Sequence, residues 1–220
     1  PAFFHGQQGI VTGRVGRAIY DITIKGKSNH FALYSKKIDP IIVSSELILA
    51  LQELKVTNKI GKQFFFVRKI NSTANGLSTP DLVKIQVDSS ILPSTTNILM
   101  LKKLKQLCRK ISEKYNGYFS IVADLVKRET PFLNPYQIKN NKYLGQMEKS
   151  ISNITHKKAV SYFRSSLADD NVFGFNGFNV LSIGPLGNNA HSSNEWVSIS
   201  SLDKLQQILV DFLTGIESKF

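Results

Sequence analysis

The order in which strand-like and helix-like patterns follow one another between residues 18 and 126 constrains the fold more than any other feature. Residues 18–25 place apolar side chains at every second position, which is the pattern of a half-buried strand. Asp39 and Pro40 then supply an N-cap and a first-turn proline for a helix. The chain therefore enters this region as a strand followed by a helix.

The rest of the region repeats these elements in a different order. The expected elements are strands at 63–70 and 83–87 with a polar loop at 71–80 between them, a helix from about Thr96 to Asn116, and a strand at 118–126. This predicts an α+β fold of the ferredoxin-like βαββαβ type, an antiparallel sheet with two helices on one face. The residues expected to point inward are Val43, Leu47, Leu51 and Leu54 on the first helix and Leu101, Leu104, Cys108 and Ile111 on the second.

A proline-punctuated segment at 130–135 separates this region from the rest, so we expect domains at 10–128 and 129–220. The second domain holds few elements, too few for an α/β core of its own, and is expected to be the closing part of a larger sheet. Its expected elements are a helix at 142–154, strands at 159–163 and 180–183, and a final helix from about Ser201 with Leu202, Leu205, Leu209 and Phe212 inward.

Composition excludes several classes of protein. The single cysteine, Cys108, rules out an internal disulfide, and no apolar run approaches the length of a membrane span, so a cytoplasmic location is expected. The formal net charge of +12 raises the question of nucleic acid. Because the lysines are scattered and no Arg-rich or aromatic-interleaved motif is present, a solvated basic surface is the better interpretation.

The sequence GPLGNNAHSSNEWVSI, residues 184–199, places His191 in a Gly and Asn-rich loop after the expected strand 180–183. A loop at the end of a buried strand can present an imidazole to a metal ion, with Gly184 and Gly187 allowing tight turns. One histidine without clustered ligands is more often an ordinary surface residue. Spacing alone leaves both interpretations open.

The residues around this loop are more specific. SLADDNVF at 166–173 and GFNVLSIGPLGNNAHSSNEW at 177–196 resemble the carboxyl-terminal end of the co-catalytic zinc exopeptidases and deacylases, the family of succinyl-diaminopimelate desuccinylase, acetylornithine deacetylase, aminoacylase, carboxypeptidase G and peptidase T. The resemblance implies that His191 is a zinc ligand. It also implies that Asp169 and Glu195 support the site without binding the ion.

A second segment, GRVGRAIYDITIKGKSNH at 13–30, resembles the opening of the lid domain of the same family. The resemblance implies a homodimer in which His30 reaches the partner's active site and stabilises the oxyanion. It implies that Asn75 binds substrate, in a loop where an ordinary turn residue is the alternative. The family's V-D-x-R pattern ends here in Ser90, so either the substrate has no free carboxylate or its clamp comes from elsewhere, with Arg68 and Lys69 as candidates.

The family's remaining metal ligands, in an H-x-D motif, a bridging Asp, a Glu-Glu pair and one further carboxylate, have no counterpart here. The resemblance therefore implies the lid and the end of the catalytic domain of a two-zinc hydrolase that cleaves amide bonds in peptides or N-acyl amino acids. Without its amino-terminal half we expect no activity. The alternatives are a non-catalytic dimerisation or binding protein and, less favoured, a basic nucleic-acid-binding domain.

Overall fold

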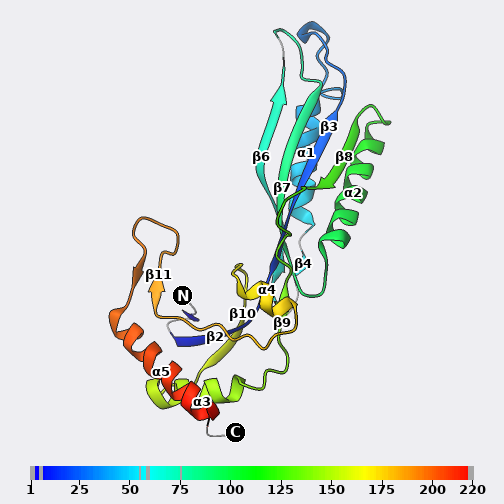
Figure 1. The fold of residues 1–220 in the computed structure, drawn as a ribbon. Helices are drawn as coiled ribbons and strands as arrows, with labels where there is room; N and C mark the ends of the chain where they lie inside the picture. Colours follow the sequence, from blue (N-terminus) through cyan, green and yellow to red (C-terminus); the bar gives the residue numbers. More distant parts are fainter. Residues whose placement is uncertain (1–2, 5–6, 55, 58–59, 75, 218–220) are drawn as a thin grey trace. The chain divides into compact units, whose positions relative to one another are not determined.

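A computed structural model describes residues 3–4, 7–54, 56–57, 60–74 and 76–217 (Figure 1). The chain divides into two compact units. The central unit comprises Val15–Pro135, and the terminal unit comprises Pro1–Arg14 together with Tyr136–Phe220. The second boundary lies at the end of the proline-punctuated segment. The first falls at residue 15 and not at residue 10, because the preceding strand pairs within the terminal unit.

The central unit is built on a four-stranded antiparallel sheet in the order β6-β7-β3-β8. Helices α1 and α2 cover one face of it (Figure 1). In chain order its main elements are β3 (Gly16–Lys25), α1 (Pro40–Glu53), β6 (Phe65–Thr73), β7 (Leu82–Ile91), α2 (Asn97–Lys114) and β8 (Ser120–Leu125), with a 3-10 turn, η1 (Phe31–Leu33), and a short hairpin of β4 (Val56–Thr57) and β5 (Lys62–Gln63). This confirms the predicted fold class and the order of elements.

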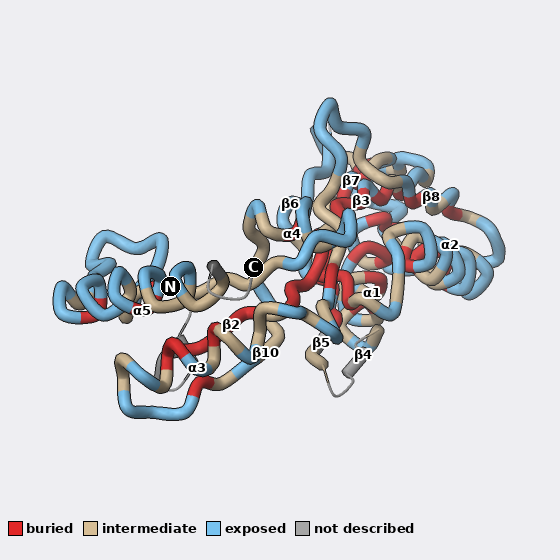
Figure 2. The backbone as a smooth tube through the Cα atoms, turned by 60° about the horizontal axis from the view of Figure 1, so that its bottom comes forward, coloured by how far each residue is buried: buried red, intermediate tan, exposed pale blue. Residues whose placement is uncertain are grey.

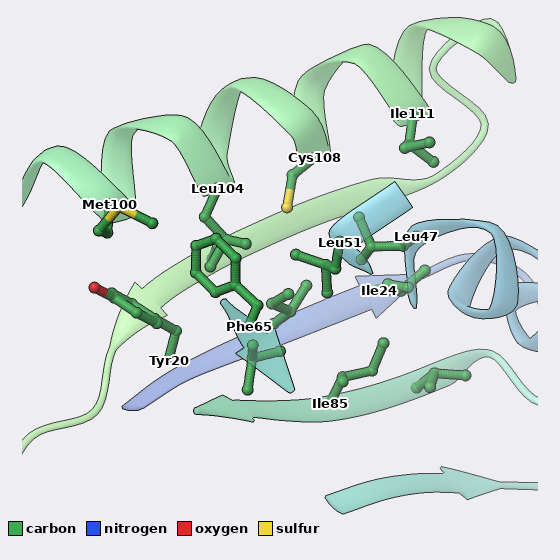
Figure 3. Packing of buried hydrophobic residues seen from close by; sticks show 14 of the residues in the cluster. Tyr20, Ile24, Leu47, Leu51, Phe65, Ile85, Met100, Leu104, Cys108 and Ile111 are labelled. Atoms are coloured by element: carbon green, nitrogen blue, oxygen red, sulfur yellow. The ribbon is translucent and has the colours of Figure 1, made fainter. Parts of the chain in front are cut away.

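The core of the central unit lies between the sheet and the two helices. Figure 3 shows the α2 side chains, including Leu104 and Cys108, packed above Tyr20 of β3 and Phe65 of β6. Tyr20 is fully buried, and its hydroxyl donates to the carbonyl oxygen of Asn97 at 3.0 Å. Burying apolar area of this size is the main favourable term in folding. The central unit thus has a complete core of its own.

Both helices begin where the sequence predicts, and each has a capping side chain. Asp39 accepts a hydrogen bond from the Ile41 amide at 2.8 Å, and Thr96 accepts one from the Leu99 amide at 3.2 Å. Most of the residues expected to face inward are buried, although Leu54 and Leu101 are only partly so and Met100 takes a buried position instead. The loop expected from residue 71 begins three residues later, since β6 continues to Thr73 by pairing with β7.

The terminal unit contains a parallel pair of strands, β2 (Gln7–Arg14) and β10 (Val160–Arg164). Strand β2 also pairs antiparallel with β1 (Phe3–Phe4) and β9 (Tyr136–Gln137). Helices α3 (Leu144–Thr155) and α5 (Ile199–Glu217) share a small core of Ile10, Met147, Ile151, Ala159 and Ile208. A short helix, α4 (Asp170–Phe175), and a hairpin of β11 (Gly187–Asn188) and β12 (Trp196–Val197) complete the unit.

One expectation for this unit was wrong, one was wrong in part, and one strand was missed. Residues 180–183 form no strand; they make one antiparallel bridge, in which Val11 and Ser182 exchange backbone hydrogen bonds of 2.8 and 3.2 Å. Strand β2 was not predicted at all. On α5 the fully buried apolar residue is Ile208, and Phe212 packs partly buried against the same core as expected, whereas Leu202 and Leu209 are 42% and 40% exposed. Figure 2 shows how much of α5 is exposed.

Within the part of the chain that the structure describes, we find no helix with the length and apolar character of a transmembrane span.

Candidate functional site

His191 lies in the loop that joins β11 to β12. Two residues of this loop, Asn189 and His191, have positive φ angles of 57° and 66°, an uncommon conformation outside glycine. Side-chain hydrogen bonds hold them in it. The Ser192 hydroxyl donates to the Asn189 carbonyl at 2.7 Å, and the His191 amide donates to Glu195 Oε2 at 3.2 Å. The loop is therefore shaped by its own polar residues.

The imidazole of His191 is exposed to solvent, and Glu195 contacts the backbone of His191 and not its ring. A cavity of about 340 Å³ lies beside the hairpin and is lined by Pro185, Gly187, Glu195, Trp196 and Val197. The structure thus brings Glu195 to His191 as a residue that positions the loop. Gly187 and Pro185, from the segment 184–189, form part of the cavity wall.

Asp169 is exposed and makes no capping hydrogen bond to α4. Its neighbour Asp170 is instead held in a mostly buried polar cluster. Arg14 Nε lies 2.8 and 2.7 Å from the two carboxylate oxygens of Asp170, Arg14 Nη1 donates to Ser166 at 2.9 Å, and Ser182 donates to Asp170. The polar contacts of this segment thus belong to Asp170, and the supporting role of Asp169 stays a prediction.

Burial and hydrogen bonding act in opposite directions on the pKa of Asp170. Burial raises the pKa of Asp170, but hydrogen bonds from Arg14 and Ser182 outweigh it and leave that pKa below its ordinary value. Burial, together with the charge of Asp170, raises the pKa of Tyr136 to about 12. At neutral pH the cluster therefore holds an ionised carboxylate, a guanidinium and a protonated phenol. Because Asp170 is the first residue of α4, its ion pair with Arg14 holds the start of this helix in place.

His30 belongs to the central unit, at the end of the segment after β3. It forms an isolated antiparallel bridge with Ser78, and its Nδ1 accepts a hydrogen bond from the Ala32 amide at 3.3 Å. Its ring packs against Phe31, with 4.7 Å between ring centroids. When Nδ1 of a neutral imidazole accepts, the proton resides on Nε2. The exposed ring of His30 is therefore set up as a hydrogen-bond donor.

The expected substrate contacts have mixed outcomes. Asn75 lies outside the described residues. Arg68 is 3.7 Å from the buried carboxylate of Asp88, which Arg17 also engages through two 3.0 Å contacts of its Nε. Part of the Arg68 charge is thus compensated within the protein. Lys69 is exposed. Ser90 is largely buried and accepts a hydrogen bond from the Phe64 amide at 3.3 Å.

A zinc site needs three or four ligands. Among the residues that the structure describes, no group of three His, Cys, Asp or Glu side chains lies close enough to hold an ion. His191 can supply one imidazole, and Glu195 is turned toward the backbone. These residues by themselves do not fit a zinc ion.

No protein-family model matches the chain. Among curated proteins, succinyl-diaminopimelate desuccinylase of Helicobacter pylori is 21% identical over 214 residues, which are 94% of this chain and 52% of that protein. N-acetyl-L-cysteine deacetylase of Bacillus subtilis is 30% identical over 124 residues, 54% of this chain and 29% of that protein. A solved aminopeptidase from Bacillus cereus covers 96% of this chain with a TM-score of 0.73 at 14% identity, using 55% of its own length.

The chain is similar in sequence to a desuccinylase and a deacetylase and similar in fold to an aminopeptidase. The match to the Helicobacter pylori desuccinylase extends over nearly the whole chain and includes both units. The solved aminopeptidase has the same fold over nearly the whole of this chain. The chain nevertheless spans only about half the length of that desuccinylase, and less of the deacetylase.

Proposed function

We propose that these residues form the dimerising lid and the end of the catalytic domain of a metal-dependent hydrolase that cleaves amide bonds in small peptides or N-acyl amino acids. The hairpin loop carries the proposal, because Glu195 fixes the backbone at His191 while the imidazole faces outward. Relatives whose names describe desuccinylation, deacetylation and peptidase activity support the choice of amide substrates.

In this proposal His191 is one zinc ligand, and the other ligands come from polypeptide outside these 220 residues. Asp169 is proposed to support the site, as the sequence pattern implies. When bound, zinc would polarise the scissile carbonyl and activate water. The proposed two-ion centre, like a cytoplasmic location, remains a prediction from the sequence.

His30 is proposed to donate from Nε2 to the oxyanion in the active site of a partner subunit. The hydrogen bond from Ala32 to Nδ1 supports this role, since it favours the tautomer that carries the proton on the exposed nitrogen. Removing one such donor from an oxyanion site typically costs about 100-fold or more in turnover number. Asn75 remains the proposed substrate contact.

One observation favours the second candidate, a binding protein that has kept the lid as a dimerisation module. The described residues hold no group of three potential metal ligands. The two candidates differ in what the gene encodes upstream of residue 1: the hydrolase requires an H-x-D motif and further carboxylates there, and the binding protein does not.

The hydrolase proposal is tested first on the 220-residue chain. With zinc present, it should show no turnover of N-acetyl amino acids, N-succinyl amino acids or tripeptides, and its zinc affinity should not change in His191→Ala. Measurable turnover would contradict the view that the other ligands lie elsewhere.

The second test uses the protein extended by its upstream reading frame. Its zinc content should fall in His191→Ala, and its turnover number should fall about 100-fold in His30→Ala with zinc content unchanged. A decrease of less than about threefold in His30→Ala would rule out the oxyanion role. An upstream frame without metal ligands would favour the binding protein.

A further inference from the structure

A cavity of about 830 Å³ opens in the central unit where the segment before α1 meets the end of α2. This volume is within the range of roughly 300 to 1,000 Å³ that is usual for small-molecule sites. Its lining comes from three places: the segment 36–38, one face of α1, and the turn that follows α2. The lining residues are Lys36, Lys37, Ile38, Ile42, Glu46, Lys114, Tyr115, Asn116, Gly117 and Tyr118.

The charge of this lining is strongly unbalanced. Lys114 pairs with Glu46 at 2.7 Å, which leaves Lys36 and Lys37 without an ion pair anywhere in the described ranges. The central unit as a whole contains 19 of the 28 lysines and arginines but only 9 of the 16 acidic residues, a net charge of +10. An anion is therefore attracted to this unit at long range and meets uncompensated ammonium groups at the cavity.

The one carboxylate in the cavity does not cancel this charge. Hydrogen bonds from Lys114 and from the Tyr115 hydroxyl, both 2.7 Å long, lower the pKa of Glu46. Burial and the neighbouring Glu46 raise the pKa of Tyr115 to about 12, so its phenol remains protonated. Glu46 is thus an ionised group already occupied by two donors. It holds Lys114 and Tyr115 in place at the cavity wall.

The aromatic part of the wall is also fixed before any ligand binds. Phe119 is fully enclosed and makes edge contacts with both tyrosine rings, at 5.4 Å from Tyr115 and 4.9 Å from Tyr118 between centroids. The Tyr118 hydroxyl accepts a hydrogen bond from the Asn29 side chain at 3.3 Å. Rings held in this way lose little conformational entropy on binding. Together with Ile38 and Ile42 they give the cavity an apolar side.

We propose that this cavity is a binding site for a small organic anion, a carboxylate or phosphate attached to a short apolar or aromatic group. Lys36 and Lys37 bind the anionic group, and Ile42 and the tyrosine rings contact the apolar group. The site is independent of the proposed hydrolase function, because it lies wholly within the central unit and shares no residue with the His191 loop.

Amide chemical shifts of the ¹⁵N-labelled 220-residue chain at low salt test this proposal, with phenyl phosphate, benzoate, inorganic phosphate and the neutral benzyl alcohol as probes. Phenyl phosphate or benzoate should produce saturable shifts at Asn116, Gly117 and Tyr118. Inorganic phosphate should bind at least fivefold more weakly if the apolar wall contributes. Benzyl alcohol should not saturate. The ratio of phenyl phosphate to benzoate affinity identifies the preferred anion.

Variants separate a specific site from general attraction to a basic surface. Lys36→Gln/Lys37→Gln should raise the dissociation constant at least tenfold. The matched control Lys25→Gln/Lys84→Gln removes the same charge from exposed positions on the open face of the sheet and should change it less than twofold. Glu46→Gln removes the negative charge from the cavity and releases Lys114, so it should tighten binding severalfold.

Three results would overturn the proposal: equal losses in the two lysine double variants, saturation by benzyl alcohol with the same affinity, or weaker anion binding in Glu46→Gln with an otherwise unchanged spectrum. Because all substituted side chains are partly or fully exposed, the amide spectrum of each variant also verifies that it is folded.

Discussion

Asp169 and Asp170 are adjacent in the chain and have opposite surroundings. Asp169 is in solvent, whereas the Asp170 carboxylate is 11% exposed and receives hydrogen bonds from Arg14 and Ser182. Removing one partner of a mostly buried ion pair leaves the other charge without compensation. Only the second of these two aspartates is therefore important for the stability of the terminal unit.

Asp170→Asn should lower the free energy of unfolding of the terminal unit by about 3 kcal/mol, because Arg14 then remains buried opposite a neutral amide. Asp169→Asn is the matched control and should change it by less than about 0.5 kcal/mol. Peptide-resolved hydrogen exchange in increasing urea measures this unit separately. Equal effects of the two substitutions would contradict the assignment.

The same pair gives a pH dependence with a definite sign. Because its pKa is lowered in the folded state, Asp170 stabilises the protein above the ordinary carboxyl pKa of about 4 and loses that contribution as the pH falls through the lower folded value. The stability difference between the native chain and Asp170→Asn should be constant from about pH 5 to 7 and should shrink in acid.

Local contacts could be predicted at this scale, and distant ones could not. Glu195 and His191 are four residues apart, so their association follows from one loop motif. Arg14 and Asp170 are 156 residues apart, and no local pattern indicates that they meet. The supporting role of Asp169, which the resemblance implies, stays a prediction.

At the scale of elements, the helices of the central unit were predictable because their caps and apolar stripes are local. Asp39 begins α1 and Thr96 begins α2 as expected. The sequence predictions fail where contacts between elements distant in the chain determine the structure. Residues 180–183 remain a single bridge to β2, and the stripe on α5 depends on where α3 packs.

Asp39→Ala should destabilise the central unit by about 1 kcal/mol, since the Ile41 amide loses its acceptor at the start of α1. Asp39→Asn, which keeps an acceptor oxygen, should have a smaller effect. Native-state hydrogen exchange of residues 40–54 measures the change. The same substitution at the exposed Asp81 provides the control. An equal loss there would indicate a charge effect and not a cap.

At the scale of the whole molecule, the exposed edges of the central sheet determine how two copies could associate. Strand β6 lies at one edge and carries the exposed apolar residues Phe66 and Ile70, while β8 lies at the other edge. An edge strand offers unpaired backbone groups to a second chain. We propose that the homodimer implied by the sequence resemblance forms along β6.

Phe66→Ser should raise the dimer dissociation constant at least tenfold in sedimentation velocity. Val122→Ser is the matched control on β8, because Val122 and Phe66 are 47% and 46% exposed. If the control weakens association as much as Phe66→Ser does, or if only Val122→Ser does so, the β6 interface is wrong. A chain that is monomeric at every concentration would exclude the dimer altogether.

Cysteine and tryptophan each occur once in this protein, and each can report on the unit in which it lies. Its only cysteine, Cys108, is buried in the central unit, where burial raises the pKa of the thiol to about 12. Its only tryptophan, Trp196, is 48% exposed in β12, next to the loop that carries His191. Thiol labelling therefore follows the opening of one unit, and indole fluorescence reports on the hairpin of the other, in one unmodified sample.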